Sequence, residues 1–124
     1  MRMRDSNDIE IYVRDCSLVS IRAWLSATFG PLSEFEEVES TLFCRSRDVD
    51  IVITPAIENG PFISIWFPTA GTPWRTDVEC ARQAAQQLRV TVRCDPGNEF
   101  PEVHPSSDVF LEIYNGTERL LVWE

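Results

Sequence analysis

The chain has 124 residues, of which 44% are hydrophobic and 25% are charged, and it contains four Trp and seven Phe. This length and composition predict one globular domain over residues 1–124. They exclude a disordered chain, which would have a low content of hydrophobic residues. Eleven Arg and no Lys stand against twenty Asp and Glu, which gives a net charge of −9. Such a charge disfavours binding to nucleic acid or to a membrane surface, and it favours a basic protein partner or serves solubility alone.

The four cysteines are far apart in the sequence and form no CxxC pair: they are Cys16, Cys44, Cys80 and Cys94. Structural zinc needs closely spaced ligands, and His104 is the only histidine, so no zinc site or other cofactor is expected. Residues 1–9 lack the apolar segment of a signal peptide, and no run of apolar side chains exceeds four residues. These features predict a soluble, cytoplasmic protein with reduced cysteines.

The first two elements have clear local signals. Residues 8–14 alternate between apolar and polar side chains, with Ile9, Ile11 and Val13 on one side, which predicts a half-buried strand. Ser17 is then placed to cap a helix that runs to Phe29 with apolar residues at helical spacing. Gly30-Pro31 is the expected end of this helix.

Three strands are predicted next, at residues 35–45, 49–54 and 62–67. They are rich in β-branched and aromatic residues. Residues 46–48 are short enough for a hairpin connection between the first two. Pro55 ends the second strand, because proline lacks the N–H that a ladder needs. Residues 58–61 read as a turn before the third strand.

The second helix begins with a capping box, Thr76-Asp77-Val78-Glu79. We expect the Thr76 hydroxyl to accept the amide of Glu79, and the Glu79 carboxylate to reach back to Thr76. A short strand at 90–92 and a proline-rich irregular stretch at 95–107 are predicted to follow. Asn115-Gly116, between strands at 109–114 and 118–123, is a strong hairpin signal.

The predicted order of elements is β-α-β-β-β-α-β-β-β. It indicates an α+β fold with a mostly antiparallel sheet and two helices on one face. The arrangement matches a ferredoxin-like variant with an added C-terminal hairpin. The second face of such a sheet carries aromatic side chains that loops, a twin subunit or a partner must cover. We expect these to be Tyr12, Phe62, Trp66, Phe110 and Tyr114.

The loop around His104 is a weak candidate for a metal site, with oxygen ligands from Asp95, Glu99 and Glu102. Its spacing fits no calcium loop, and an exposed histidine in a polar loop is the simpler interpretation, so no metal is predicted. A Cys16–His104 dyad is the one nucleophile–base pairing that a single histidine allows. Nothing in the sequence brings these two residues together, and no catalytic residue is assigned.

The leading hypothesis is a non-enzymatic protein-interaction domain, such as an immunity, antitoxin or adaptor protein, that binds a basic partner. Exposed aromatic residues next to carboxylates are typical of protein-binding surfaces. The candidate residues for partner binding are Trp66, Phe67, Trp74, Glu36 and Glu37. The alternative is a small-molecule-binding regulatory domain, in which a homodimer is an option, and the third is an enzyme or metal site around the acidic His104 loop.

Overall fold

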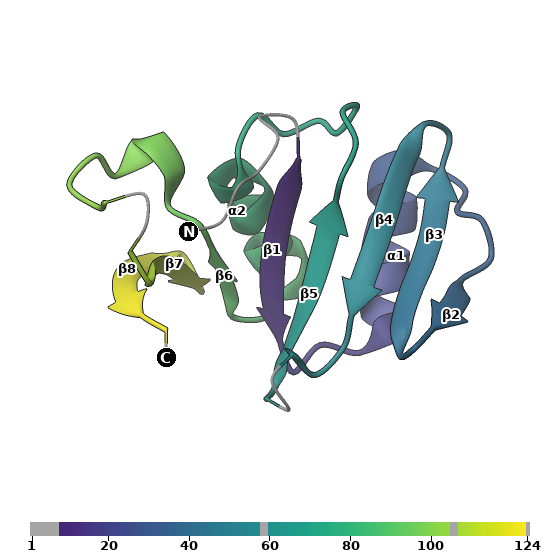
Figure 1. Cartoon of the computed structure of the whole chain (residues 1–124), viewed down its shortest axis with the longest axis horizontal. Helices are drawn as coiled ribbons and strands as arrows, with labels where there is room; N and C mark the ends of the chain where they lie inside the picture. The colour runs from purple at the N-terminus through teal and green to yellow at the C-terminus, as the bar shows by residue number, and fades with distance from the viewer. Residues whose placement is uncertain (1–7, 58–59, 105–106, 124) are drawn as a thin grey trace.

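The computed structural model describes residues 8–57, 60–104 and 107–123. Parts of the N-terminal segment at 1–9, of the turn at 58–61 and of the stretch at 95–107 therefore lie outside the described residues. The described chain has an α+β fold with two α-helices and one antiparallel sheet of order β2-β3-β4-β5-β1-β6-β7-β8 (Figure 1). Its elements are β1 (Ile9–Arg14), α1 (Leu18–Phe29), β2 (Glu36–Val38), β3 (Thr41–Ser46), β4 (Val49–Thr54), β5 (Phe62–Phe67), α2 (Asp77–Leu88), β6 (Val92–Cys94), a short 3₁₀ turn (Gly97–Glu99), β7 (Val109–Tyr114) and β8 (Thr117–Val122).

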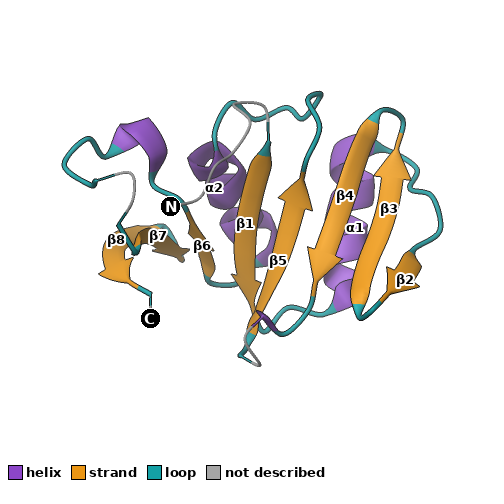
Figure 2. Cartoon of the chain, viewed as in Figure 1, coloured by secondary structure: helices purple, strands orange, loops and turns teal. Residues whose placement is uncertain are grey.

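The strand registers divide the sheet into two faces. Ile11 of β1 is paired with Ile65 of β5 and Cys94 of β6, and all three are buried in the core. The same core contains Leu25 of α1 and Val78 of α2. Figure 2 shows α1 behind β3 and β4, and α2 behind β1 and β6. We call the opposite side of the sheet the outer face. Glu10, Tyr12 and Arg14 of β1 lie on it.

Most predicted elements are present with small shifts. The predicted strand at 35–45 is instead a hairpin of β2 and β3, because Glu39 and Ser40 both have positive φ, at 50° and 70°. Two-residue hairpin turns of this kind usually contain Asn or Gly, so the sequence carried no turn signal at this point. The short strand predicted at 90–92 lies at Val92–Cys94, and the last strand begins one residue earlier than predicted.

The helix starts follow the predicted caps, with one difference. Ser17 Oγ accepts the N–H of Ser20, and Thr76 Oγ1 accepts the N–H of Glu79 at 3.1 Å. The Glu79 carboxylate accepts the N–H of Arg75 at 3.0 Å rather than that of Thr76. The carboxylate thus closes the cap one residue earlier than in a standard capping box. None of the helices in the described chain is long and apolar enough to span a membrane.

Replacing Thr76 with Ala is expected to lower the free energy of unfolding by about 1 kcal/mol, because the amide of Glu79 loses its partner at the start of α2. Thr76→Ser is the control, since it keeps the hydroxyl and is expected to cost much less. Urea denaturation followed by circular dichroism measures both values. Equal destabilisation by the two substitutions would show that the methyl group of Thr76, and not its cap, contributes the stability.

Candidate functional site

The outer face is divided into a covered half and an open half. On β1, β5 and β7, the rings of Tyr12, Phe62 and Phe110 gather around Trp123, with ring centroids 4.8–5.1 Å from the Trp123 ring. Trp123 is held next to β7 by its backbone N–H, which donates to the carbonyl of Asp108 at 3.1 Å. Tyr12 and Phe62 are therefore buried. The protein's own C-terminal segment covers this half.

An ion-pair cluster, with Arg93 and Glu112 at its buried end, completes the covered half. The guanidinium of Arg93 lies 4.6 Å from the Phe62 ring centroid and 4.8 Å from that of Trp123, which is cation–π geometry. Arg93 Nε donates to Glu112 Oε2 at 2.8 Å, and Arg119 Nε donates to Glu112 Oε1 at 2.9 Å. Burial raises the pKa of Glu112, but the hydrogen bonds from Arg93 and Arg119 outweigh it and leave the pKa below its ordinary value. The single carboxylate of Glu112 thus pairs with two guanidinium groups in this half.

The open half carries an apolar row across four strands. Phe43 of β3 lies opposite Val52 of β4, and Val52 lies opposite Trp66 of β5. Phe43 is 39% exposed and Trp66 is 38% exposed, and Val38 of β2 is also exposed. Trp66 Nε1 donates to Asp8 Oδ2 at 3.0 Å, which fixes the orientation of its ring. We call Val38, Phe43, Val52 and Trp66 the open patch.

Acidic side chains border the open patch on β2. Glu36 is paired with Phe43 and is exposed on the same outer face. Glu37 is exposed as well, but it alternates to the other side of the strand. Of the two predicted acidic residues, Glu36 is thus the one whose carboxylate lies next to the exposed aromatic side chains.

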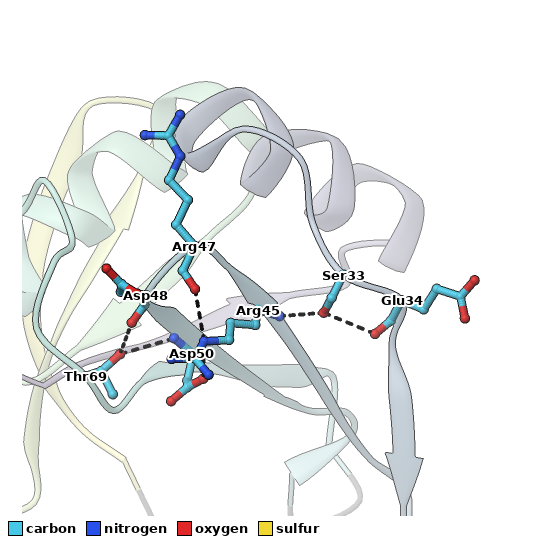
Figure 3. Close-up of polar contacts among 7 residues, drawn as sticks. All are labelled: Ser33, Glu34, Arg45, Arg47, Asp48, Asp50 and Thr69. Carbon is cyan, nitrogen blue, oxygen red and sulfur yellow. Dashed lines mark hydrogen bonds and ion pairs between the residues drawn. The ribbon is translucent and has the colours of Figure 1, made fainter.

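Polar contacts hold the β3–β4 hairpin that carries the patch (Figure 3). The N–H of Arg45 donates to Ser33 Oγ at 2.8 Å, and Arg45 Nε donates to the carbonyl of Arg47 at 3.0 Å. Arg45 Nε also lies 3.4 Å from Asp50 Oδ1. The N–H of Asp50 donates to Thr69 Oγ1 at 3.1 Å. Segments on both sides of the hairpin therefore restrain it, and the patch is preorganised.

Two of the other predicted binding residues lie in the core. Phe67 is fully buried, and Trp74 is 8% exposed. The Trp74 ring stacks on Trp24 of α1 with centroids 5.7 Å apart, and its Nε1 donates to Gln83 Oε1 of α2. Neither ring is available at the surface. Of the predicted set, Trp66 and Glu36 are the residues that the structure brings together on the outer face.

The acidic loop does not form a metal site in the part of the chain that is described. No group of three or more His, Cys, Asp or Glu residues there could hold a metal ion. Glu99 Oε1 instead lies 3.0 Å from Arg82 Nη1, and Asp95 Oδ1 accepts the N–H of Gly97 at 2.8 Å. The structure thus does not bring the candidates Asp95, Glu99, Glu102 and His104 together as ligands.

All four cysteines are free and buried. Burial raises the pKa of the Cys16 thiol, and it raises the pKa of Cys44 to about 11 against the lowering effect of Arg22. A thiol with a raised pKa is protonated at neutral pH and is a poor nucleophile. These side chains pack in the core as small apolar groups.

A separate groove lies between α2 and the β7–β8 hairpin. It has a volume of about 610 Å³. Helix side chains and the hairpin turn form its walls: Arg82, Ala85, Gln86, Arg89, Ile113, Tyr114, Asn115, Gly116 and Glu118. We call it the α2–hairpin groove. No sequence pattern predicted this groove, because the Asn115-Gly116 turn was recognisable but nothing in the sequence placed that turn next to α2.

Comparisons with protein families, with curated proteins and with solved structures found no match. A functional assignment therefore depends on the chemistry of the surfaces themselves. Among the described residues, the open patch and the α2–hairpin groove offer such chemistry.

Proposed function

We propose that this protein is a non-enzymatic protein-interaction domain that binds a basic partner through the open patch. The observation that carries the proposal is the exposed row of Phe43, Val52 and Trp66 next to the carboxylate of Glu36. Aromatic anchors with a charged border are typical of protein-binding surfaces. An antitoxin, immunity or adaptor protein would use such a surface to capture its target, and four free cysteines fit a cytoplasmic location.

The charge favours a basic partner over a second copy of the chain. The net charge is −9, and exposed acidic residues cluster around β2, at Glu34, Glu36, Glu37 and Glu39. A homodimer across the open patch would bring these like charges closer together, which is unfavourable. A basic partner is attracted by the same acidic residues, and this attraction steers it toward the patch during diffusion.

Covering the patch also removes apolar surface from water, which is favourable by about 25 cal/mol per Å². In the described chain, the covered half of the outer face is shielded by Trp123, whereas Phe43 and Trp66 each keep more than a third of their surface exposed. A partner that covers them would shield the open half from water, as the C-terminal segment shields the covered half.

Replacing Trp66 with Ala is expected to weaken partner binding by at least about tenfold, because a central aromatic anchor is lost. Phe43→Ser should act in the same direction. Tyr114→Ala is the matched control, since Tyr114 is an exposed aromatic residue at the far end of the outer face. Glu36→Arg should mainly slow association, and raising the salt concentration should reduce that difference.

The experiment uses the full chain and these variants as bait in a lysate of its own host, followed by mass spectrometry. The proposal is supported if a basic protein is captured by the parent chain and by Tyr114→Ala but not by Trp66→Ala or Phe43→Ser. Its purified form is then tested for the association rate as a function of salt. Retention of the same proteins by every variant, or capture of an acidic one through the patch, would contradict the proposal.

We also infer that the fold is a ferredoxin-like variant with both helices packed on one face. The adjacent strands β4-β5-β1-β6, with a helix after β1 and another after β5, support this inference. In this interpretation β7 and β8 are the added C-terminal hairpin, and β2 and β3 extend the opposite edge. The extension supplies two residues of the open patch, Val38 and Phe43.

A second candidate function, a small-molecule-binding regulatory domain, is favoured by the α2–hairpin groove. Its volume of about 610 Å³ lies within the range of ligand sites, which is roughly 300–1,000 Å³. The groove lies on α2 and the hairpin, whereas the patch lies on β2–β5. A ligand and a protein partner would therefore occupy different parts of the molecule.

A further inference from the structure

The sheet ends in two edges of different character (Figure 1). At one end, β2 has only three residues, and two of them are Glu. At the other end, β8 has six residues, and its pairing with β7 is continuous from Thr117 to Val122, without a bulge or a proline. Proteins usually shorten, charge or interrupt an edge strand so that it does not pair with another chain. By length and regularity, β8 is thus the edge that is open to pairing.

The backbone of β8 presents unpaired groups at this edge. The N–H of Trp123 donates to the carbonyl of Asp108, on the β7 side, and the two-residue turn at Asn115-Gly116 sets the same alternation from the other end of the hairpin. Odd-numbered residues of β8 therefore bond to β7, and the N–H and C=O groups of the even-numbered residues point outward. The outward residues are Glu118, Leu120 and Val122. Among the described residues these groups have no backbone partner, and an extended chain is the structure that pairs with all of them at once.

The two charged side chains of β8 are already paired within the chain. Glu118 accepts Arg82 Nε at 2.7 Å and Arg82 Nη2 at 3.0 Å, on the side of the sheet that carries the helices. Arg119 Nε donates to Glu112 Oε1 at 2.9 Å on the outer face. Val122, in contrast, is an apolar side chain that is 59% exposed. The edge thus combines free backbone groups with apolar surface, and its charges are compensated by neighbouring strands and α2.

We propose that β8 is a dimerisation edge, where the β8 strands of two copies of this chain pair antiparallel and join their sheets into one. The register that pairs all of the outward groups places Leu120 opposite Leu120 of the second copy, and Glu118 opposite Val122. Arg119 then lies opposite Leu121. A shift of the register toward the turn would place Arg119 opposite its own counterpart, which is unfavourable.

The charge distribution favours contact between copies at β8 rather than at the open patch. The acidic residues around β2 lie at the far end of the sheet, seven strand spacings from β8, or about 34 Å at the usual spacing. This distance far exceeds the Debye length of about 8 Å at physiological salt, so these charges repel one another little across a β8 dimer. The two outer faces point to the same side in such a dimer, and both open patches stay free. The inference therefore does not rest on partner binding at the open patch.

Sedimentation equilibrium of the full chain, between micromolar and millimolar concentrations, tests the proposal. The expected result is a reversible equilibrium of monomer and dimer. Val122→Pro is expected to weaken the dimer by at least about tenfold, because it removes one outward N–H from each copy and no hydrogen bond to β7. Val122→Thr is the matched control, since it keeps both the N–H and the shape of the side chain. A chain that stays monomeric throughout, or equal dimerisation of the two variants, would overturn the proposal.

A charge swap at Leu120 tests the register and keeps the test decisive if the proline variant fails to fold. Leu120→Glu and Leu120→Lys are each expected to be monomeric, because like charges meet at the two-fold axis, whereas an equal mixture of the two should form a heterodimer. Circular dichroism checks that both variants are folded. Failure of the folded mixture to dimerise would overturn the β8 register. A parent dimer that Trp66→Ala abolishes would place the interface at the open patch and overturn the β8 edge.

Discussion

Replacing Trp74 with Ala is expected to lower the free energy of unfolding by about 3–5 kcal/mol, the cost of removing a large aromatic side chain from a core. Trp74 is 8% exposed and packs among Trp24, Phe29 and Phe67, with ring centroids 5.3–5.7 Å away. Its loss leaves a cavity between the loop before α2, helix α1 and the sheet. It also leaves Gln83 Oε1 without the indole N–H that it accepts.

Trp66→Ala is the control for this prediction. Trp66 is 38% exposed, and it contributes less buried area and one hydrogen bond to Asp8. Guanidinium denaturation followed by far-ultraviolet circular dichroism measures both variants without relying on tryptophan fluorescence. If Trp66→Ala proves as destabilising as Trp74→Ala, the two residues do not differ in burial as described, and Trp66 is a structural residue rather than a binding one.

Replacing Glu112 with Ala is expected to cost about 3–5 kcal/mol, because it leaves a partly buried arginine without its counter-ion. Glu112 is buried, and the Arg93 side chain between Phe62 and Trp123 is only 14% exposed. Arg119→Ala is the control, since the Arg119 side chain is 69% exposed and its removal should cost no more than about 1 kcal/mol. Chemical denaturation at neutral pH measures both, and equal losses would contradict the buried-pair interpretation.

The same cluster predicts a dependence of stability on pH. The pKa of Glu112 in the folded protein is below its ordinary value of 4.5, because the hydrogen bonds from Arg93 and Arg119 outweigh the raising effect of burial. A carboxyl group with a lowered pKa contributes stability that is fully present above the ordinary value and is lost as the pH falls through the folded pKa. Unfolding free energies of the parent chain and Glu112→Gln should therefore converge below pH 4.5. A constant difference between pH 7 and pH 3 would exclude this role for Glu112.

The local structure of this protein was largely determined by short stretches of its sequence. Ser17 and Thr76 begin the two helices, and Asn115-Gly116 joins β7 to β8, as predicted. Each of these features depends on hydrogen bonds or φ angles within about four residues, so a few side chains suffice to specify it. The turn at Glu39-Ser40 was missed because these residue types do not favour positive φ on their own.

The tertiary structure alone decided which aromatic residues are available for binding. Both Trp66 and Trp74 were candidates for partner binding, but Trp66 lies on the outer face of β5 and Trp74 stacks on Trp24 in the core. The coverage of Phe62 by Trp123 joins segments about sixty residues apart, and the α2–hairpin groove likewise joins Arg89 to Asn115. Such contacts depend on the order in which strands pair across the sheet. That order is set by the packing of the whole core, to which residues throughout the chain contribute, and no local pattern encodes it.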